Sequence, residues 1–371
     1  MRLNGYSVNA ILSCSLRGAG RLVFPSVLAC ICVNPGPLRA ASFDCANAGQ
    51  HVEQLVCEDA ELSELDDHLS AVYRASWSDS TAAGQKQLKL DQQRWLKRRN
   101  ACGDRECLKE AYEIRLAVLG NDWGECPLSR CTRFVDSGAD KQLWASAEKG
   151  DLAGAKAALL KGAAPNVCGS SYDRPLHLAV FKKNLELVRI LLGAKANPNV
   201  MNCPGYTPLS HAVYANDIDT ALALISAGAD PDLGGDTSPL GMAAFHGQVE
   251  LVKLLLAHGA SPNAVRGGTT PLILAVNKLH VEAVQLLLEA GANPNFQEGI
   301  SGNVLFDAVG GFRVAPPKPE ELERALKVVK LLVQHGIDVN AKTAGQSALD
   351  RARWLKETAI VEFLIESGAT R

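Results

Sequence analysis

Cysteine is the residue type in this chain whose number and spacing point most directly to chemistry. Eight of the eleven cysteines follow residue 41, and six of these eight stand as close pairs in the first third of the chain. An even number of paired cysteines is typical of a disulfide framework in an oxidising compartment. The expected disulfides, in chain order, are Cys45–Cys57, Cys102–Cys107 and Cys126–Cys131.

Zinc is the alternative use of clustered cysteines. Four residues separate the members of the second and third pairs, which is at the loose end of zinc-site spacing, and His51 and His68 are available as further ligands. Neither a two-residue cysteine knuckle nor a His-x-x-x-His partner accompanies them. We therefore expect disulfides and no metal. A pairing of Cys168 with Cys203 is left open.

Residues that could catalyse a reaction do not form a known motif. The sequence has no His-Glu-x-x-His, no Gly-x-Ser-x-Gly and no glycine loop closed by Lys-Ser or Lys-Thr. Asp217 and Asp219 could be paired carboxylates, but their position before Ile218 favours a helix cap. We therefore expect no catalytic residue and no cofactor, and we predict that the protein is not an enzyme.

A repeated unit must position whatever binding residues the chain carries. A closing Asn or Asp recurs at steps of 33, 33, 31, 32 and 45 residues, and an opening signal recurs in phase with it. The closing residues are Asn166, Asn199, Asp232, Asn263, Asn295 and Asn340. The opening signals are Arg174-Pro175-Leu176-His177, Thr207-Pro208-Leu209-Ser210, Ser238-Pro239-Leu240-Gly241 and Thr270-Pro271-Leu272-Ile273.

This pattern resembles the ankyrin repeat in its period and in its Thr-Pro-Leu-His signal. The resemblance implies an all-α solenoid of helix-turn-helix repeats with short hairpin loops over residues 140–371, in about seven repeats. It also implies that His177 braces a turn. The terminal copies are degenerate, the sixth carries an insertion at 310–322, and Lys195 replaces a glycine at a helix end, where we expect strain.

Three aromatic residues outside the repeat signature recur at one repeat position. Phe181, Tyr214 and Phe245 each stand seven residues after the start of an opening signal. Because their spacing follows the repeat, we expect the rings to line up on one face, and an exposed aromatic row is typical of an interface. The alternative is that the rings pack on each other or on the N-terminal domain. We predict a partner-binding surface that also includes Tyr206 and Phe312.

The first 41 residues read as a secretory signal peptide. They carry four arginines, no acidic residue, an apolar run at 22–33 and a small-residue stretch before Ser42. The apolar run is too short to span a bilayer. Its removal would change the net charge from −2 to −6 and so favour a basic partner. A lipoprotein signal ending at Cys30 is the alternative.

Residues 42–122 predict a small domain of three helices, followed by a linker at 123–139. Apolar residues recur at helical spacing around Leu65, Trp95 and Tyr112. The first helical region is acidic and the second basic, so we expect them to lie side by side. About 80 residues give a marginal core, which disulfides would staple.

A second resemblance lies in this domain. The residues that carry it are Phe43-Asp44-Cys45, Val56-Cys57, Leu65-Asp66, Tyr73, Gln92 to Trp95-Leu96, Arg98, Cys102, Cys107-Leu108 and Tyr112. In this order they resemble the N-terminal domain of LprI-type lysozyme inhibitors of bacterial envelopes. The resemblance implies export, to the periplasm or outside the cell, and binding to a lysozyme-type muramidase.

Together, these features predict an exported interaction module that binds a protein client through the ankyrin groove. The alternative is an immunity factor against a peptidoglycan-active enzyme, or such an enzyme itself. We expect no nucleic-acid partner, because the chain has no excess of positive charge. We expect no transmembrane span in the mature chain.

Overall fold

The computed structural model describes most of the chain after its first 44 residues. The described residues are 45, 51–79, 82–120, 137–169, 173–202, 205–296, 303–310 and 318–370. No helix in these ranges is long and apolar enough to cross a membrane. The expected signal segment, the linker and the Cys126–Cys131 pair lie outside the described residues, apart from the linker's last three positions.

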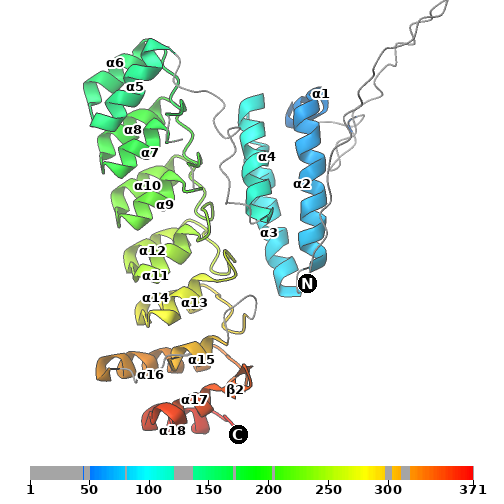
Figure 1. The fold of residues 1–371 in the computed structure, drawn as a ribbon, viewed down its shortest axis with the longest axis vertical. Coiled ribbons are helices and arrows are strands. Elements are labelled where there is room, and N and C mark those ends of the chain that lie inside the picture. Colours follow the sequence, from blue (N-terminus) through cyan, green and yellow to red (C-terminus); the bar gives the residue numbers. More distant parts are fainter. Residues whose placement is uncertain are drawn as a thin grey trace, which may run out of the picture. The chain divides into compact units, whose positions relative to one another are not determined.

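The first part of the described chain is a bundle of four helices, which we call the helical domain. The helices are α1 (His51–Glu58), α2 (Ala60–Asp79), α3 (Ala82–Arg99) and α4 (Arg105–Gly120) (Figure 1). The expectation of three helices was wrong because α1 was missed. Its eight residues present only Val52 and Val56 to the core, which is too little periodic signal to find from sequence.

Aromatic packing forms the core of the helical domain. Trp95 and Tyr112 are buried, with their ring centroids 5.3 Å apart in an edge-to-face arrangement. Their polar atoms are satisfied: the Trp95 indole donates to the Ala111 carbonyl, and the Tyr112 hydroxyl donates to Asp66. Burial is the main cause that raises the pKa of Tyr112. Most residues that carried the second resemblance thus build the domain itself.

Two disulfides staple this bundle, as expected. Cys45–Cys57 ties the segment before α1 to its last turn, and Cys102–Cys107 closes the loop between α3 and α4. The acidic α2 contacts both α3 and α4. Its first turn pairs with α4, where Arg105 contacts Asp59 and Glu61. These oxidised cysteines are therefore not zinc ligands in this structure. Cys168, in the repeats, is also disulfide-bonded.

The rest of the described chain is a stack of antiparallel helix pairs. In chain order they are α5 (Gly138–Lys149) with α6 (Leu152–Leu160), α7 (Pro175–Phe181) with α8 (Leu185–Gly193), α9 (Pro208–Tyr214) with α10 (Ile218–Ser226), α11 (Pro239–His246) with α12 (Val249–Ala257), α13 (Pro271–Asn277) with α14 (Val281–Glu289), α15 (Val304–Ala308) with α16 (Pro319–Gln334), and α17 (Ala348–Leu355) with α18 (Thr358–Glu366). A two-stranded hairpin, β1 (Lys342–Thr343) and β2 (Gln346–Ser347), precedes α17. Figure 1 shows the helix pairs stacked in chain order. One apolar cluster runs through all seven pairs, from Leu143 to Ala369.

Each opening signal starts a helix for a physical reason. In α9, α11 and α13 the Thr or Ser is the N-cap, and its hydroxyl accepts a hydrogen bond from the backbone three residues later. The proline follows in the first turn, where its missing N–H costs nothing. In α7 the cap position holds Arg174 instead. Asp217 caps α10 as expected, with its carboxylate accepting from Thr220 N–H.

The closing Asn and Asp residues bond one repeat to the next. The Asn263 side chain accepts from the Asn293 backbone at 2.7 Å and donates to the Gly291 carbonyl at 2.9 Å. The accepting half of this arrangement recurs at every closing position, for example from Asp230 N–H to Asn199. The acceptors are the side chains of Asn166, Asn199, Asp232, Asn263, Asn295 and Asn340. The closing Asn and Asp residues thus form a ladder of hydrogen bonds that joins consecutive repeats.

Two departures from the repeat pattern have structural consequences. Lys195 adopts a φ of 67° at a position where other repeats place glycines such as Gly228 and Gly259, which confirms the expected strain. In the sixth repeat, α16 begins at Pro319, inside the 310–322 range expected for the insertion. The insertion therefore adds residues to the helix as well as to the segment before it.

Candidate protein-binding surfaces

The three aromatic residues expected on one face are exposed in the structure. Phe181 is 73% exposed, Tyr214 69% and Phe245 36%, although all three are large apolar or amphipathic rings. They end the first helices of three consecutive repeats, α7, α9 and α11, or stand one residue before the end. We call these three residues the ring row. Such exposure costs solubility without helping the fold, which favours a role in binding.

Histidines stand between the rings of the row. Phe181 packs edge-to-face on His211 with ring centroids 6.2 Å apart, and His246 contacts both Tyr214 at 5.9 Å and Phe245 at 5.1 Å. The rings are therefore held by imidazoles of the following or the same repeat, and the alternative of packing on each other does not describe these contacts. The row is a fixed surface of rings rather than three independent side chains.

The charge beside the ring row is positive. Lys182 follows Phe181 and is exposed, and the ammonium of Lys278 lies 4.5 Å from the centroid of the Phe245 ring. Burial lowers the pKa of His211, so its imidazole stays neutral near pH 7. The local sign is opposite to the negative net charge of the whole sequence. The row therefore suits an apolar segment flanked by carboxylates better than a basic one.

Two other residues expected at this surface are not part of the ring row. Tyr206 is half-buried against the core, and its ring lies 5.6 Å from His211 in a tilted arrangement. Its backbone carbonyl is 3.1 Å from the His177 Nε2 atom. Tyr206 thus supports the ring row through its contact with His211. Phe312 lies outside the described residues.

His177 has the bracing role that the ankyrin resemblance implied. Its Nδ1 accepts from the Arg174 backbone at 3.3 Å, while Nε2 contacts the next repeat at Tyr206. Burial, with the nearby Arg174 charge, lowers the pKa of His177 to about 3. The imidazole is therefore neutral over the ordinary pH range and links two repeats.

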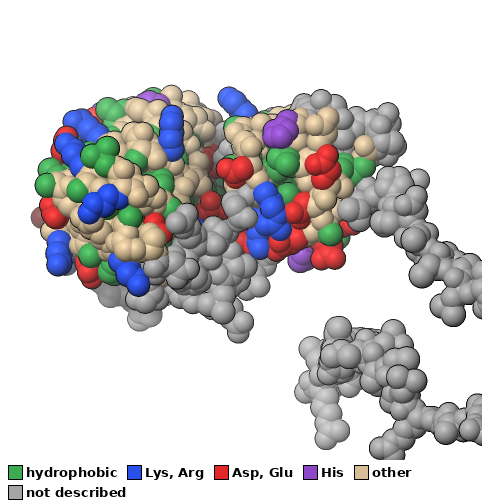
Figure 2. Space-filling view, turned by 90° about the horizontal axis from the view of Figure 1, so that it is seen from above, with side chains coloured by type: hydrophobic (Ala, Val, Ile, Leu, Met, Phe, Trp, Pro, Cys, Tyr) green, Lys and Arg blue, Asp and Glu red, His purple; other side chains and the backbone are tan. Residues whose placement is uncertain are grey.

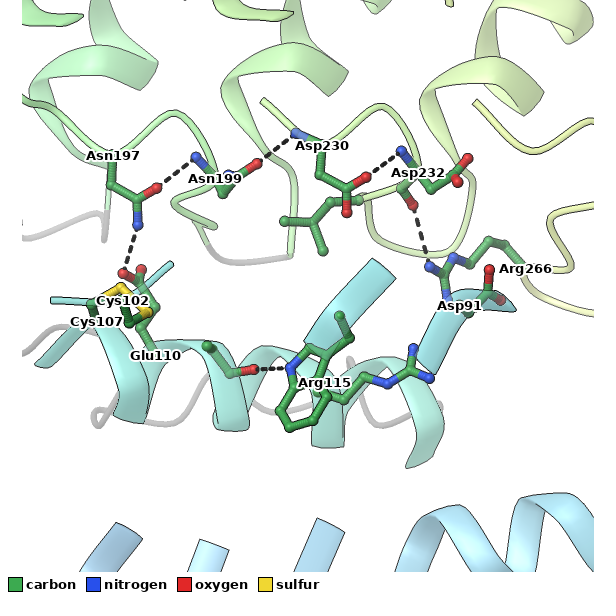
Figure 3. Close-up of a pocket in the computed structure, with 13 residues that line it drawn as sticks. Asp91, Cys102, Cys107, Glu110, Arg115, Asn197, Asn199, Asp230, Asp232 and Arg266 are labelled. Atoms are coloured by element: carbon green, nitrogen blue, oxygen red, sulfur yellow. Dashed lines mark hydrogen bonds between the residues drawn. A yellow bond between two sulfur atoms is a disulfide. The ribbon is translucent and has the colours of Figure 1, made fainter. Parts of the chain in front are cut away.

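A second surface lies where α3 and α4 of the helical domain meet the loops of the repeats. A partly open cavity of about 110 Å³ lies there, with Trp95 and the Cys102–Cys107 disulfide on one wall and Leu233 on the other. Figure 3 shows carboxylates from the helical domain pointing across it toward the loops. The cavity contains both acidic and basic groups and has no arrangement of a nucleophile with a base.

Two residues of the helical domain make the contacts across this cavity. Glu110, on α4, is 3.2 Å from the Arg174 guanidinium and accepts from the Asn197 side chain at 2.9 Å. Asp91, on α3, lies beside Arg266 in Figure 3. Arg266 donates to the Asp232 carbonyl at 3.2 Å. Burial lowers the pKa of Arg266, and the negative charge of Asp91 opposes that effect.

Sequence reasoning did not find this second surface. The available signal was Arg174, which stands where three other opening signals have Thr or Ser. An arginine in a buried capping position needs an acceptor from elsewhere. Arg174 donates to the Met201 carbonyl within the repeats, but its charge partner, Glu110, is in another domain, and nothing in the spacing of the sequence connects the two.

No large field of one sign covers the face of the molecule seen in Figure 2. Lysines, arginines and carboxylates are interspersed on it. Within the described residues, no group of three or more His, Cys, Asp or Glu side chains is arranged to hold a metal ion.

Both parts of the chain are similar to known proteins. Residues 143–235 and 232–298 match the family described as ankyrin repeats (3 copies). The N-terminal part is similar to Lipoprotein LprI of Mycobacterium tuberculosis and of Mycobacterium bovis, with 34% identity over 113 residues. That match covers 28% of this chain and 56% of the relative, so the chain spans about half the length of the curated relatives it matches.

Solved structures resemble the repeats. The ankyrin repeat domain of Bcl-3, a member of the IkappaB family, aligns with a TM-score of 0.52 and 27% identity, over 62% of this chain and 100% of that one. An ankyrin repeat domain from Acinetobacter baumannii AYE aligns with a TM-score of 0.49 and 29% identity, over 53% of this chain and 98% of that one. The chain thus combines an ankyrin-repeat domain with an LprI-like helical region. Ankyrin repeat domains are typically non-catalytic binding modules.

Proposed function

We propose that this ankyrin-repeat protein is an exported interaction module that binds a protein client on the ring row. The observation that carries the proposal is the exposure of Phe181, Tyr214 and Phe245, three large rings in phase with the repeat. Buried aromatic anchors supply most of the binding energy in typical interfaces. A fold that stacks on Leu and Ala has no structural need for them at the surface.

The client is a protein segment with apolar side chains flanked by carboxylates. The apolar part suits the exposed rings, and the carboxylates suit Lys182 and Lys278 beside them. Electrostatic complementarity of this kind contributes mainly to specificity and to the rate of association. The negative net charge of the sequence had favoured a basic client. The local charge at the ring row supports the opposite choice.

Inhibition of a lysozyme-type muramidase is the function proposed for the helical domain. Its support is the similarity to Lipoprotein LprI and the two disulfides, which also support a location outside the cytoplasm. The acidic start of α2, where Glu64 is exposed, offers charge to a basic partner. Trp95 and Tyr112 are core residues, so the inhibitory contacts would come from the exposed side chains around them.

A turbidity assay on purified cell walls tests this second function directly. We expect the protein to slow the clearing produced by added lysozyme and to leave the suspension unchanged when added alone. Clearing by the protein alone would show a peptidoglycan-active enzyme and contradict the proposal. Unchanged clearing by lysozyme would remove the inhibitor function while leaving the ring-row client untouched.

Client binding is tested by capture from envelope extract with the protein and with ring-row variants side by side. We expect one or more proteins to be retained by the parent protein and lost when Phe181 and Tyr214 are both changed to Ala. A control variant, Asn277→Ala, changes the equivalent position of the next repeat, which holds no ring. Equal retention by all three proteins would contradict the ring-row proposal.

A further inference from the structure

The loop side of the repeats carries two arginines that each face a carboxylate of the helical domain. Arg174 meets Glu110 of α4, and Arg266 lies beside Asp91 of α3 (Figure 3). The two contacts stand at different repeats, so together they fix both position and orientation. A single contact would leave the helical domain free to rotate about it.

Burial makes the first of these contacts more than a surface ion pair. The Arg174 side chain is 4% exposed and the Glu110 side chain 20%. Removing one partner of a buried pair leaves an uncompensated charge, which is strongly unfavourable. Glu110 has a second bond across the same boundary, to the side chain of Asn197. Both of its carboxylate oxygens are thus used by the repeats.

We propose that the loop side of the repeats is a receptor for the chain's own helical domain, with Arg174 and Arg266 as the receptor residues and Glu110 and Asp91 as their ligands. The two domains form one closed unit in which the face of α3 and α4 that carries the Cys102–Cys107 disulfide is covered. This inference does not depend on the ring row binding a client.

In the closed unit, different faces of the repeats contact different partners. The ring row lies at the ends of the first helices of three repeats, whereas the loops at Asn197–Asn199 and Asp230–Asp232 face the helical domain. A muramidase that binds the helical domain must therefore use α1 and α2, or displace the repeats from α3 and α4. Arg174 distinguishes its repeat from the others, because it replaces the Thr or Ser of the other opening signals.

Charge reversal with distance measurement between spin labels tests the proposal on the full chain. Labels are placed at Asp67→Cys on α2 and Glu366→Cys on α18, two exposed positions. We expect one narrow distance distribution in the parent protein and a broad one in Glu110→Arg. The pair Glu110→Arg with Arg174→Glu should narrow the distribution again, because the ion pair is restored with its signs exchanged.

A matched control separates docking from general charge effects. Glu64→Arg makes the same charge change at an exposed position of α2 and should leave the distribution narrow. If Arg174→Glu disturbs the capped helix, seen as a lowered melting temperature, Asp91→Arg provides the second test and should also broaden the distribution. A narrow distribution in both Glu110→Arg and Asp91→Arg would overturn the proposal.

Discussion

The helical domain and the repeats reach stability by opposite means. The helical domain has a small core around Trp95 and Tyr112, and two disulfides tie its loops. The repeats share one continuous apolar cluster from Leu143 to Ala369, and each repeat contacts chiefly its neighbours. A small core needs covalent staples, whereas a stacked one gains from every added repeat. Cys168 of the repeats is also disulfide-bonded, but there the stacked core carries the stability. Reduction should therefore act mainly on the helical domain, and core truncations should act mainly on the repeats.

Reduction should have the largest effect, and it should act on the helical domain. In the entropic account, opening a loop of 12 residues costs about 3 kcal/mol of stability and opening one of 5 about 2 kcal/mol. We expect a reductant to lower the first thermal transition and to increase protease cleavage within residues 51–120. A transition that shifts only in the repeats would contradict the comparison.

Truncation of a core leucine should have the next largest effect. Leu251 is fully buried at the centre of the stack. Leu251→Ala should lower the unfolding free energy of the repeats by about 3 kcal/mol, through lost burial and a residual cavity. Leu160→Ala is the control because this leucine is 89% exposed. Urea unfolding followed by circular dichroism should show a shift for the first variant only.

Acid should weaken the repeats through His177. Burial lowers its pKa from 6.5 to about 3, so below pH 6.5 the unfolded chain binds a proton that the folded chain does not. The stability contributed by the neutral imidazole is present above pH 6.5 and is lost as the pH falls toward 3. At pH 5 the loss amounts to roughly 2 kcal/mol. His177→Asn should flatten the dependence of unfolding free energy on pH between 6.5 and 4. Leu160→Ala, at an exposed position without a titratable group, should leave that dependence unchanged.

Two carboxyl groups, that of the half-buried Asp307 and that of the buried Glu357, should oppose this acid effect. Burial raises the pKa of Asp307 to about 6 and that of Glu357 to about 7. A raised pKa favours the protonated folded state, so the folded state gains stability as the pH falls through these values. Glu357→Gln should therefore stabilise the last repeat most at pH 8 and least at pH 5. An equal gain at both pH values would show that the carboxyl is not responsible.

The ladder of hydrogen bonds between repeats should contribute less to the free energy of unfolding. Asn263→Ala removes the acceptor of the Asn293 N–H and the donor to Gly291. A hydrogen bond of this kind contributes about 1 kcal/mol to stability. We expect a corresponding loss in urea unfolding, with Asn277→Ala as the control at an exposed helix position. No loss for Asn263→Ala would show that the marker residue has no role in stacking.

The sequence was sufficient for the features that recur. Period, opening signals and closing residues predicted the helix pairs, and the phase of Phe181, Tyr214 and Phe245 predicted their exposure. Features that do not recur along the chain were harder to predict from the sequence. Helix α1 has too few apolar residues to show a period, and the Glu110–Asn197 contact joins residues 87 positions apart. Such contacts depend on tertiary geometry, which no local pattern encodes.

The ring row provides the most direct test of the account, because it should change binding without changing the fold. We expect Phe181→Ala, Tyr214→Ala and Phe245→Ala each to weaken capture of the client by about 30-fold, which corresponds to ~2 kcal/mol for a buried aromatic anchor. The free energy of unfolding should stay within about 0.5 kcal/mol of that of the parent protein, as for other surface positions. A large loss of stability with client binding intact per folded molecule would assign the rings to the core and contradict the central claim.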